Sequence, residues 1–324
     1  MRVSLALGLA TAVVLSVSLS VGDYPVPLTD VVPAVFGFGH GDADFVVHTL
    51  RLPRALTAVL VGASFGCSGA ILQALARNPL ASPDIMGITT GASTAAVAIV
   101  VLAGGTSSLV SFGALAGALL TAATIYGLAY RRGVSSYRLV LVGIGVSALL
   151  SAVTSYLLTR ARIFDAQRAT VWLTGSLNGR SWGHVRPLVA ALAVLAPAVA
   201  CLHRRLRILQ LGDETARALG VPLERTRGAL VLVAVALAAV ATASAGPVAF
   251  VAFVAAPVAR RLVRAPLAVV PAALTGAQLL LVADLVARRA FAPAELPAGI
   301  VTGAVGAPYL LWLLARANRV GRGG

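Results

Sequence analysis

Long runs of uncharged, mostly apolar residues recur from one end of the chain to the other, and no other feature constrains its fold as strongly. The runs cover residues 3–21, 55–76, 85–130, 139–159, 187–202, 228–259, 265–283 and 296–315. A helix rises about 1.5 Å per residue, so about 20 such residues cross the roughly 30 Å of hydrocarbon in a bilayer. We therefore predict an all-α polytopic membrane protein with a single transmembrane domain, residues 1–324.

Composition narrows the possible functions. Charged residues make up only 11% of the chain, and all 26 basic residues are arginines. An ATP-binding loop of the form GxxxxGKS or GxxxxGKT needs a lysine, so this chain cannot bind ATP in that way. The arginines lie in short clusters between apolar runs, where the positive-inside rule accounts for them, so the net charge of +15 does not indicate a nucleic-acid partner. Cys67 and Cys201 both lie in apolar runs and are expected to be buried.

The distribution of arginine decides how many times the chain crosses the membrane. The 85–130 run is long enough for two helices, with a break near Gly104 and Gly105. Treating the 228–259 run as two crossings, with a break at Gly246 and Pro247, puts 17 arginines on the cytoplasmic side and 9 outside, whereas one crossing gives 13 and 13. We therefore predict about ten transmembrane helices with both termini cytoplasmic. The apolar segment 169–179 is too short to cross and is expected to dip in from the outer face.

A polar interval, RNPLASPDIMGITTGAS, separates two apolar runs at residues 77–93. Ser82 is predicted to cap the helix that follows, with Pro83 at its first position. Asp84 would complement the positive end of the dipole of that helix. These roles leave the preceding Asn-Pro-Leu sequence unexplained.

Several longer motifs together carry a family resemblance. They are RLPRALTAVLVGASFGCSGAILQALARNPLASPDIMGITTGAS, LVLVGIGVSALLSAVTS, VWLTGSLNGRSW, LGDETARALGV, GPVAFVAF and ADLVARRAFAPAELPAGIVTGAVGAPYLLWLL. In this order they cover most of the chain after residue 50. The sequence resembles the FecCD/BtuC-like family of bacterial type II ABC importer permeases, which take up iron-siderophore complexes, haem and vitamin B12. The resemblance implies the ten-helix type II permease fold and a place in the cytoplasmic (inner) membrane of a bacterium.

The resemblance also implies partners and a cargo. The expected partners are a second permease subunit (in a homo- or heterodimer), a cytoplasmic ATP-binding subunit that holds ATP and magnesium, an extracytoplasmic substrate-binding protein and membrane lipid. No cofactor is expected on this chain. WLTGSLNGRSW is most similar to the branch that carries ferric siderophores, although haem and cobalamin permeases share the scaffold and stay open as alternatives. An ATP-independent secondary transporter is a further alternative, disfavoured because few ionisable groups lie within the spans.

Residues 204–227 form the longest polar interval on the predicted cytoplasmic side. Asp213 is predicted to cap a helix of about two turns that ends near Gly220 and Pro222. So short a helix is marginal alone in water and must pack against something. In the family, the matching segment couples the permease to the ATPase, and a solvated loop helix is the alternative. The resemblance assigns this coupling role to Leu211, Gly212, Asp213, Glu214, Ala216, Leu219 and Gly220.

The resemblance assigns two further sites along the pathway. A cytoplasmic gate, for which an ordinary proline turn is the alternative, is expected at Asn78, Pro79 and Leu80. Residues lining the pathway are expected at Trp172, Gly175 and Ser176. For the tryptophan, an anchor at the membrane interface is the alternative.

Arginines near the predicted outer face form the last candidate site. Arg51 and Arg54, three residues apart at a helix start, could both contact an acidic partner outside the membrane. The resemblance implies that they and Arg288 dock the substrate-binding protein, and snorkelling to lipid headgroups is the alternative. Asp284, the main acid within the spans, is expected to anchor helix ends rather than to relay protons. Val258 stands where the family usually has histidine, so the role of that histidine is not supported here.

Overall fold

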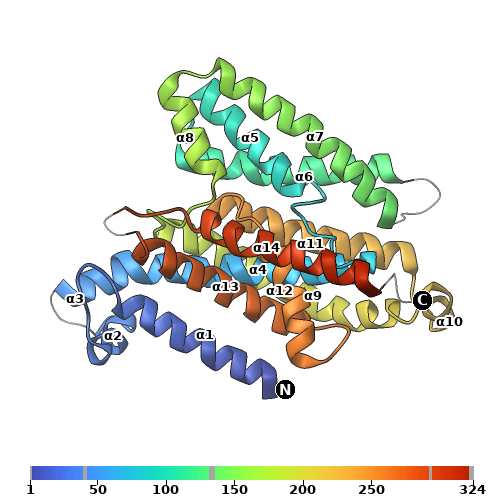
Figure 1. Ribbon diagram of the computed structural model, residues 1–324, viewed down its shortest axis with the longest axis horizontal. Helices are drawn as coiled ribbons and strands as arrows, with labels where there is room; N and C mark the ends of the chain where they lie inside the picture. The colour runs from blue at the N-terminus through green and yellow to red at the C-terminus, as the bar shows by residue number, and fades with distance from the viewer. Residues whose placement is uncertain (1, 39–41, 131–135, 292–293, 321–324) are drawn as a thin grey trace.

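The computed structural model describes residues 2–38, 42–130, 136–291 and 294–320, and the elements it assigns there are all helices (Figure 1). They are α1 (Arg2–Ser20), α2 (Leu28–Val35), α3 (Asp42–Asp44), the π-helical η1 (Phe45–Arg51), α4 (Leu52–Ala76), α5 (Ile88–Ala103), α6 (Ser107–Ala129), α7 (Ser136–Arg160), α8 (Ile163–Leu173), α9 (Trp182–Leu209), α10 (Asp213–Ala218), α11 (Leu223–Ala245), α12 (Val251–Val263), α13 (Val269–Arg289) and α14 (Ala298–Val320). The all-α prediction is confirmed for the described residues.

Both predicted breaks in the long apolar runs are confirmed. Between α5 and α6, Gly104 has a φ of 58°. Between α11 and α12, Gly246 has a φ of 78° and Pro247 follows it. Glycine adopts positive φ without the steric cost that a Cβ imposes, and proline cannot continue a helix without losing a backbone hydrogen bond. Each long run therefore divides into two helices at the expected residues.

The start of α5 differs from the prediction. The helix begins at Ile88 rather than at Pro83. Residues 83–87 form a separate turn, in which the Ser82 carbonyl accepts a hydrogen bond from the backbone N–H four residues later at 2.9 Å. Gly87, with a φ of 83°, separates this turn from α5. Asp84 consequently lies before the first turn of α5, so its predicted place beside the helix dipole was wrong.

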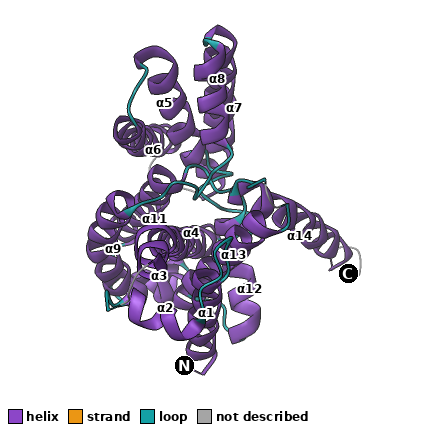
Figure 2. Cartoon of the chain, turned by 90° about the vertical axis from the view of Figure 1, so that its left-hand side faces the viewer, coloured by secondary structure: helices purple, strands orange, loops and turns teal. Residues whose placement is uncertain are grey.

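Helix α4 lies at the centre of the molecule and is mostly buried. It packs against α9, α11, α12 and α13. Helices α5, α6, α7 and α8 form a group on one side of the others, as Figures 1 and 2 show from two directions. Helix α11 contacts both α5 and α6 as well as α4, so it connects this group to the central helix.

Small residues bring α4 into backbone contact with its neighbours. A Cβ at Gly62 or Gly66 would collide with the backbone of α13, and one at Gly276 of α13 would collide with Gly62. On the other side, a Cβ at Gly69 would collide with the carbonyl of Ala252 in α12. Such close approach favours helix association within membranes. The packing of the central helix therefore depends on these glycines.

Seven helical segments in the described part of the chain are long and apolar enough to cross a membrane. They are α1, the continuous segment Asp42–Ala76 that ends with α4, α6, α7, α9, α11 and α13. Helix α5 and the first part of α14 are apolar but shorter, and α12 has 13 residues. Helix α8, with 11 residues, is too short to cross. The chain is thus a multi-pass helical membrane protein.

The two cysteines differ from each other in burial. Cys67, in α4, is buried as predicted, whereas Cys201, in α9, is exposed on this chain. The prediction for Cys201 was wrong because an apolar sequence does not say which side of a helix faces other helices. Helix α9 presents most of its surface outward, as expected where lipid rather than protein is the neighbour.

Candidate functional site

The short helix α10 begins at Asp213, directly after Gly212, which has a φ of 109°. Asp213 is therefore the first residue of the helix. The prediction that it caps the helix was wrong, because Gly212 occupies the cap position. Its carboxylate pairs with Arg227 at 2.8 Å and with Arg77 at 3.5 Å. Ala216 is fully buried. These contacts hold α10 against the ends of the longer helices, which meets the requirement that so short a helix be packed.

The other residues of the predicted coupling segment point away from the body. Leu211 is 63% exposed and Leu219 is 58% exposed. Glu214 and Gly220 are also exposed, and Gly220 has a φ of 76° with open space around its Cα. Two large apolar side chains are thus exposed on either side of the charged helix α10. The segment thus has an anchored side and a free side.

Asn78, Pro79 and Leu80 form the turn that follows α4. The Asn78 side-chain oxygen accepts a hydrogen bond from the backbone N–H of Leu80 at 2.9 Å. Asparagine characteristically stabilises turns by bonding to the backbone two residues later. Pro79 is exposed, and Leu80 is half-buried. The turn predicted here is present, while its rigidity and its action as a gate stay predictions.

Arg77 connects this turn to α10. It ends α4 with a φ of 48°, a left-handed conformation that reverses the chain. Its guanidinium donates a hydrogen bond to the carbonyl of Leu209, at the end of α9, at 3.0 Å, and contacts Asp213 at 3.5 Å. The residue that precedes Asn78 is therefore in contact with both the end of α9 and the start of α10. The sequence analysis did not single out Arg77, because its partners are more than 130 residues away.

A hydroxyl-rich pocket of about 490 Å³ lies between α5, α7 and the break before α12. Asp84 lines it, and its Oδ2 atom is buried without a hydrogen-bond partner among the described residues. The hydroxyl-bearing residues in its lining are Thr89, Thr90, Ser93, Ser151, Thr154 and Ser155. Sequence reasoning missed this buried acid because it assigned Asp84 to the start of a helix.

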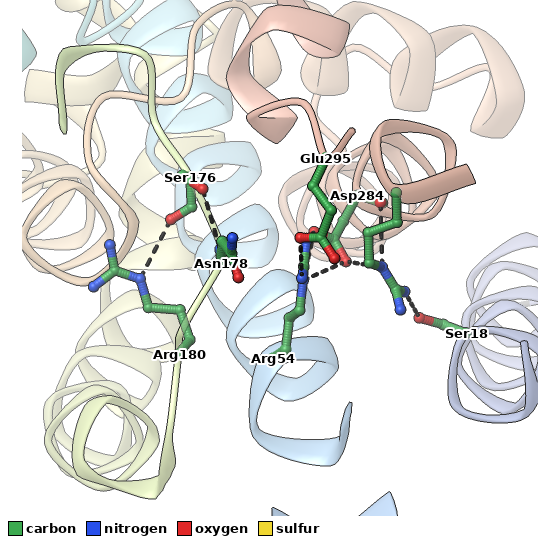
Figure 3. A network of polar contacts seen from close by, with 8 residues as sticks. Ser18, Arg54, Ser176, Asn178, Arg180, Asp284 and Glu295 are labelled. Carbon is green, nitrogen blue, oxygen red and sulfur yellow. Dashed lines mark hydrogen bonds and ion pairs between the residues drawn. The ribbon is translucent and has the colours of Figure 1, made fainter. Parts of the chain in front are cut away.

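At the opposite end of α4, Asp284 anchors three helices (Figure 3). Its carboxylate, only 1% exposed, pairs with Arg54 of α4 at 3.0 Å and with Arg288 of α13 at 3.1 Å. Arg288 also donates a hydrogen bond to the Ser18 hydroxyl of α1 at 2.8 Å. Arg54 contacts Glu295 at 3.0 Å as well. The expectation that Asp284 anchors neighbouring helix ends is confirmed.

Arg51 bonds to backbone oxygens of its own chain. Its guanidinium donates hydrogen bonds to the carbonyls of Leu19 at 2.8 Å, Ser20 at 3.1 Å and Tyr24 at 2.5 Å. All three arginines predicted to dock an external protein therefore have contacts within this chain. Docking by Arg51, Arg54 and Arg288 stays a prediction, and an acidic partner would have to compete with these contacts.

A pocket of about 770 Å³ lies beside this network, between α8, the 174–181 loop and the segment before α14. Trp172 and Ser176, two of the predicted pathway residues, line it. Gly175 is buried behind them with a φ of 69°, and a Cβ there would contact the Pro247 carbonyl. Arg180, in the same loop, donates a hydrogen bond to the carbonyl of Ser176 at 3.3 Å. Burial lowers the pKa of the Arg180 guanidinium because the charged form loses hydration.

Comparison with known proteins identifies the family. The sequence description of the FecCD transport family matches residues 10–316. This chain belongs to the FecCD transport family. The FecCD assignment confirms the resemblance found in the sequence, and the match runs from within α1 to within α14.

Two FecCD relatives are especially similar to this chain. It is 44% identical over 292 residues to the ferric enterobactin transport system permease protein FepG of Escherichia coli, and the aligned region covers 90% of this chain and 88% of FepG. It is 45% identical over 319 residues to the achromobactin transport system permease protein CbrC of Dickeya dadantii, and the aligned region covers 97% of this chain and 91% of CbrC.

A solved structure shares the FecCD fold. It is described as a metal-chelate type ABC transporter in an inward-facing conformation, and it superposes with a TM-score of 0.87 at 28% identity, covering 97% of this chain and 99% of the other.

Val258, at the position where the family usually has histidine, lies on α12 and lines an apolar pocket of about 430 Å³ with residues of α13 and α14. No titratable side chain replaces that histidine at this position.

Proposed function

We propose that this chain is the permease subunit of an ABC importer that moves a ferric siderophore across the cytoplasmic membrane of a bacterium. The names of FepG and CbrC, which refer to ferric enterobactin and achromobactin transport, support this cargo. The observation that carries the proposal is the α10 segment, in which Leu211 and Leu219 are exposed while Asp213 is fixed to the body. This chain lacks the lysine that an ATP-binding loop of the GxxxxGKS or GxxxxGKT form needs. An exposed surface on α10 would let a separate ATPase subunit bind and move it.

The proposed topology has ten transmembrane helices, namely α1, α4, α5, α6, α7, α9, α11, α12, α13 and α14. With α10 in the cytoplasm, the arginine distribution of 17 inside and 9 outside supports this arrangement and puts both termini in the cytoplasm. Helix α8 then dips from the outer face, and the Asp284 network lies at the outer ends of α4 and α13.

ATP and magnesium bind to the partner ATPase, and α10 receives its movement. When α10 is displaced, Asp213 moves Arg77 with it. Arg77 in turn moves the turn at residues 78–80, which acts as the cytoplasmic gate. The 3.5 Å contact between Arg77 and Asp213 and the 3.0 Å bond between Arg77 and the Leu209 carbonyl support this route. The exposed parts of the segment, Leu211 and Leu219, face the ATPase.

On the outer side, Arg51, Arg54 and Arg288 dock the substrate-binding protein. Glu295, whose side chain is 40% exposed, is the contact of Arg54 that an acidic residue of the binding protein can most easily replace. The second permease subunit packs against α7, whose residues Leu141, Leu149 and Tyr156 are all more than half exposed. Lipid covers the remaining apolar surface.

The test is cargo-dependent ATP hydrolysis by the purified complex in lipid nanodiscs. We expect the ATPase rate to rise with the binding protein loaded with a ferric siderophore, together with uptake of iron into proteoliposomes. Stimulation by haem or cobalamin instead would assign the alternative cargo. Uptake against a gradient by this chain alone, driven by an ion gradient, would contradict the proposal and favour a secondary transporter.

A further inference from the structure

The arginines near the proposed outer face differ in how their charge is balanced. Arg54 and Arg288 pair with Asp284, and Arg289 pairs with Asp23 at 3.2 Å. No such ion pair joins Arg168 or Arg180 to an acid in the part of the chain that the structure describes; the two basic side chains instead line the same 770 Å³ pocket. Two arginines that have no ion pair among the described residues therefore line this one pocket.

Backbone contacts hold both arginines in place. Arg180 uses Nε to bond to the Ser176 carbonyl, which leaves its two terminal nitrogens available, and the side chain is half-buried. Arg168 comes from α8 and donates a hydrogen bond from one terminal nitrogen to the carbonyl of Gly105 at 3.4 Å. Arg168 is exposed, so the argument from lost hydration applies to Arg180. The half-buried Arg180 guanidinium, with no ion pair among the described residues, gains more from an anion than a fully solvated one does.

The remaining wall of the pocket does not cancel this charge. Glu295 lines the same pocket, but its carboxylate already contacts Arg54 at 3.0 Å. Figure 3 shows Asn178 between Arg180 and Glu295 in that view, with Arg180 apart from the acidic network. Trp172 adds an aromatic side chain to the lining. The pocket thus combines net positive charge with an aromatic surface.

We infer that Arg168 and Arg180 form a binding subsite for the anionic oxygen atoms of a ferric chelate, of the catecholate or carboxylate class, as it enters the permease. Arginine suits this role because its planar guanidinium can donate two parallel hydrogen bonds to such oxygens. An uncharged chelate offers oxygen acceptors without net negative charge and forms weaker hydrogen bonds with a guanidinium, so the subsite selects cargo by charge. The inference rests on the proposed function, since it assumes that the cargo is a ferric chelate.

The experiment compares two iron-radiolabelled probes, the polyanionic ferric tris(catecholate) and the uncharged ferric tris(acetohydroxamate). Equilibrium binding is measured without binding protein, on the full chain purified with its partner subunits in nanodiscs. For Arg180→Gln we expect roughly tenfold weaker binding of the anionic probe, because hydrogen bonds to charged groups contribute the most, and unchanged binding of the uncharged probe. Arg180→Lys keeps the charge but loses the paired donors of the guanidinium, so its affinity for the anionic probe should lie between those of Arg180→Gln and the unaltered protein. Arg186→Gln removes an exposed arginine of α9 that lies outside this pocket, and should change neither value.

Two results for Arg180→Gln, and one for the unaltered complex, overturn the subsite. One is that Arg180→Gln binds both probes as tightly as the unaltered protein, and the other is that it weakens both equally, which would indicate a change of shape rather than of charge. If the unaltered complex binds neither ferric probe, the subsite is overturned together with the ferric cargo. Cargo-stimulated ATP hydrolysis by Arg180→Gln at saturating loaded binding protein separates the cases, because it depends on the proposed function and not on this subsite.

Discussion

Asp284 and Glu295 offer a direct measurement of what burial adds to an ion pair in this protein. Both contact the guanidinium of Arg54 at 3.0 Å, but their side chains are 1% and 40% exposed. Asp284 also pairs with Arg288 at 3.1 Å, so removing its charge leaves two arginines, 13% and 12% exposed, without their buried counter-charge. Breaking a buried pair by removing one partner costs about 3–5 kcal/mol, whereas an exposed pair contributes about 0–1 kcal/mol.

We therefore expect Asp284→Asn, which keeps the shape, to destabilise the protein by about 3 kcal/mol or more, and Glu295→Gln by less than about 1 kcal/mol. The assay is denaturant unfolding of both variants in the same detergent, followed by circular dichroism, with thermal melting as a second measure. Equal destabilisation by the two variants, or a loss below about 1 kcal/mol for Asp284→Asn, would refute the reasoning from burial.

Three further variants test the packing and the proposed coupling. Gly66→Leu should lower the free energy of unfolding by about 1–3 kcal/mol, because the larger side chain pushes α13 away. Gly145→Leu, at a position with open space beside it, should change the free energy of unfolding by less than about 0.5 kcal/mol. Similar melting temperatures for the two variants would contradict the close packing. Gly220→Val and Gly37→Val place valine at nearly the same positive φ, 76° and 77°, so both should carry about 1–3 kcal/mol of strain. Only Gly220→Val should abolish cargo-stimulated ATP hydrolysis, and equal hydrolysis in the two variants would exclude α10 as the coupling element. Arg77→Gln should reduce cargo moved per ATP roughly tenfold while basal hydrolysis persists, and normal transport would exclude Arg77 as the connection.

Features governed by local chemistry could be predicted from the sequence. The breaks at Gly104 and Gly246 follow from residues that tolerate positive φ or interrupt a helix, and the turn at residues 78–80 follows from its asparagine and proline. Where two local preferences compete, the prediction failed by a few residues. Ser82 and Pro83 favour a helix start, but Gly87 takes a positive φ and delays α5 to Ile88.

Features that depend on distant residues could not be predicted. Nothing near Arg54 in the sequence shows that its partner, Asp284, lies 230 residues away, or that Arg77 reaches α10. The exposure of Cys201 and the unpaired oxygen of Asp84 depend likewise on how helices are placed around each other. The family resemblance singled out Arg54 by its position, and it gave no contact for that residue.

The contact between Arg77 and Asp213 has a consequence for control of the partner enzyme. Free-energy coupling between two sites is reciprocal: if the position of α10 biases the turn at residues 78–80, the state of that turn biases α10 by the same amount. Cargo pressing on the inner mouth would then change the affinity of the permease for the ATPase. An importer built in this way senses its own load without a separate receptor for it.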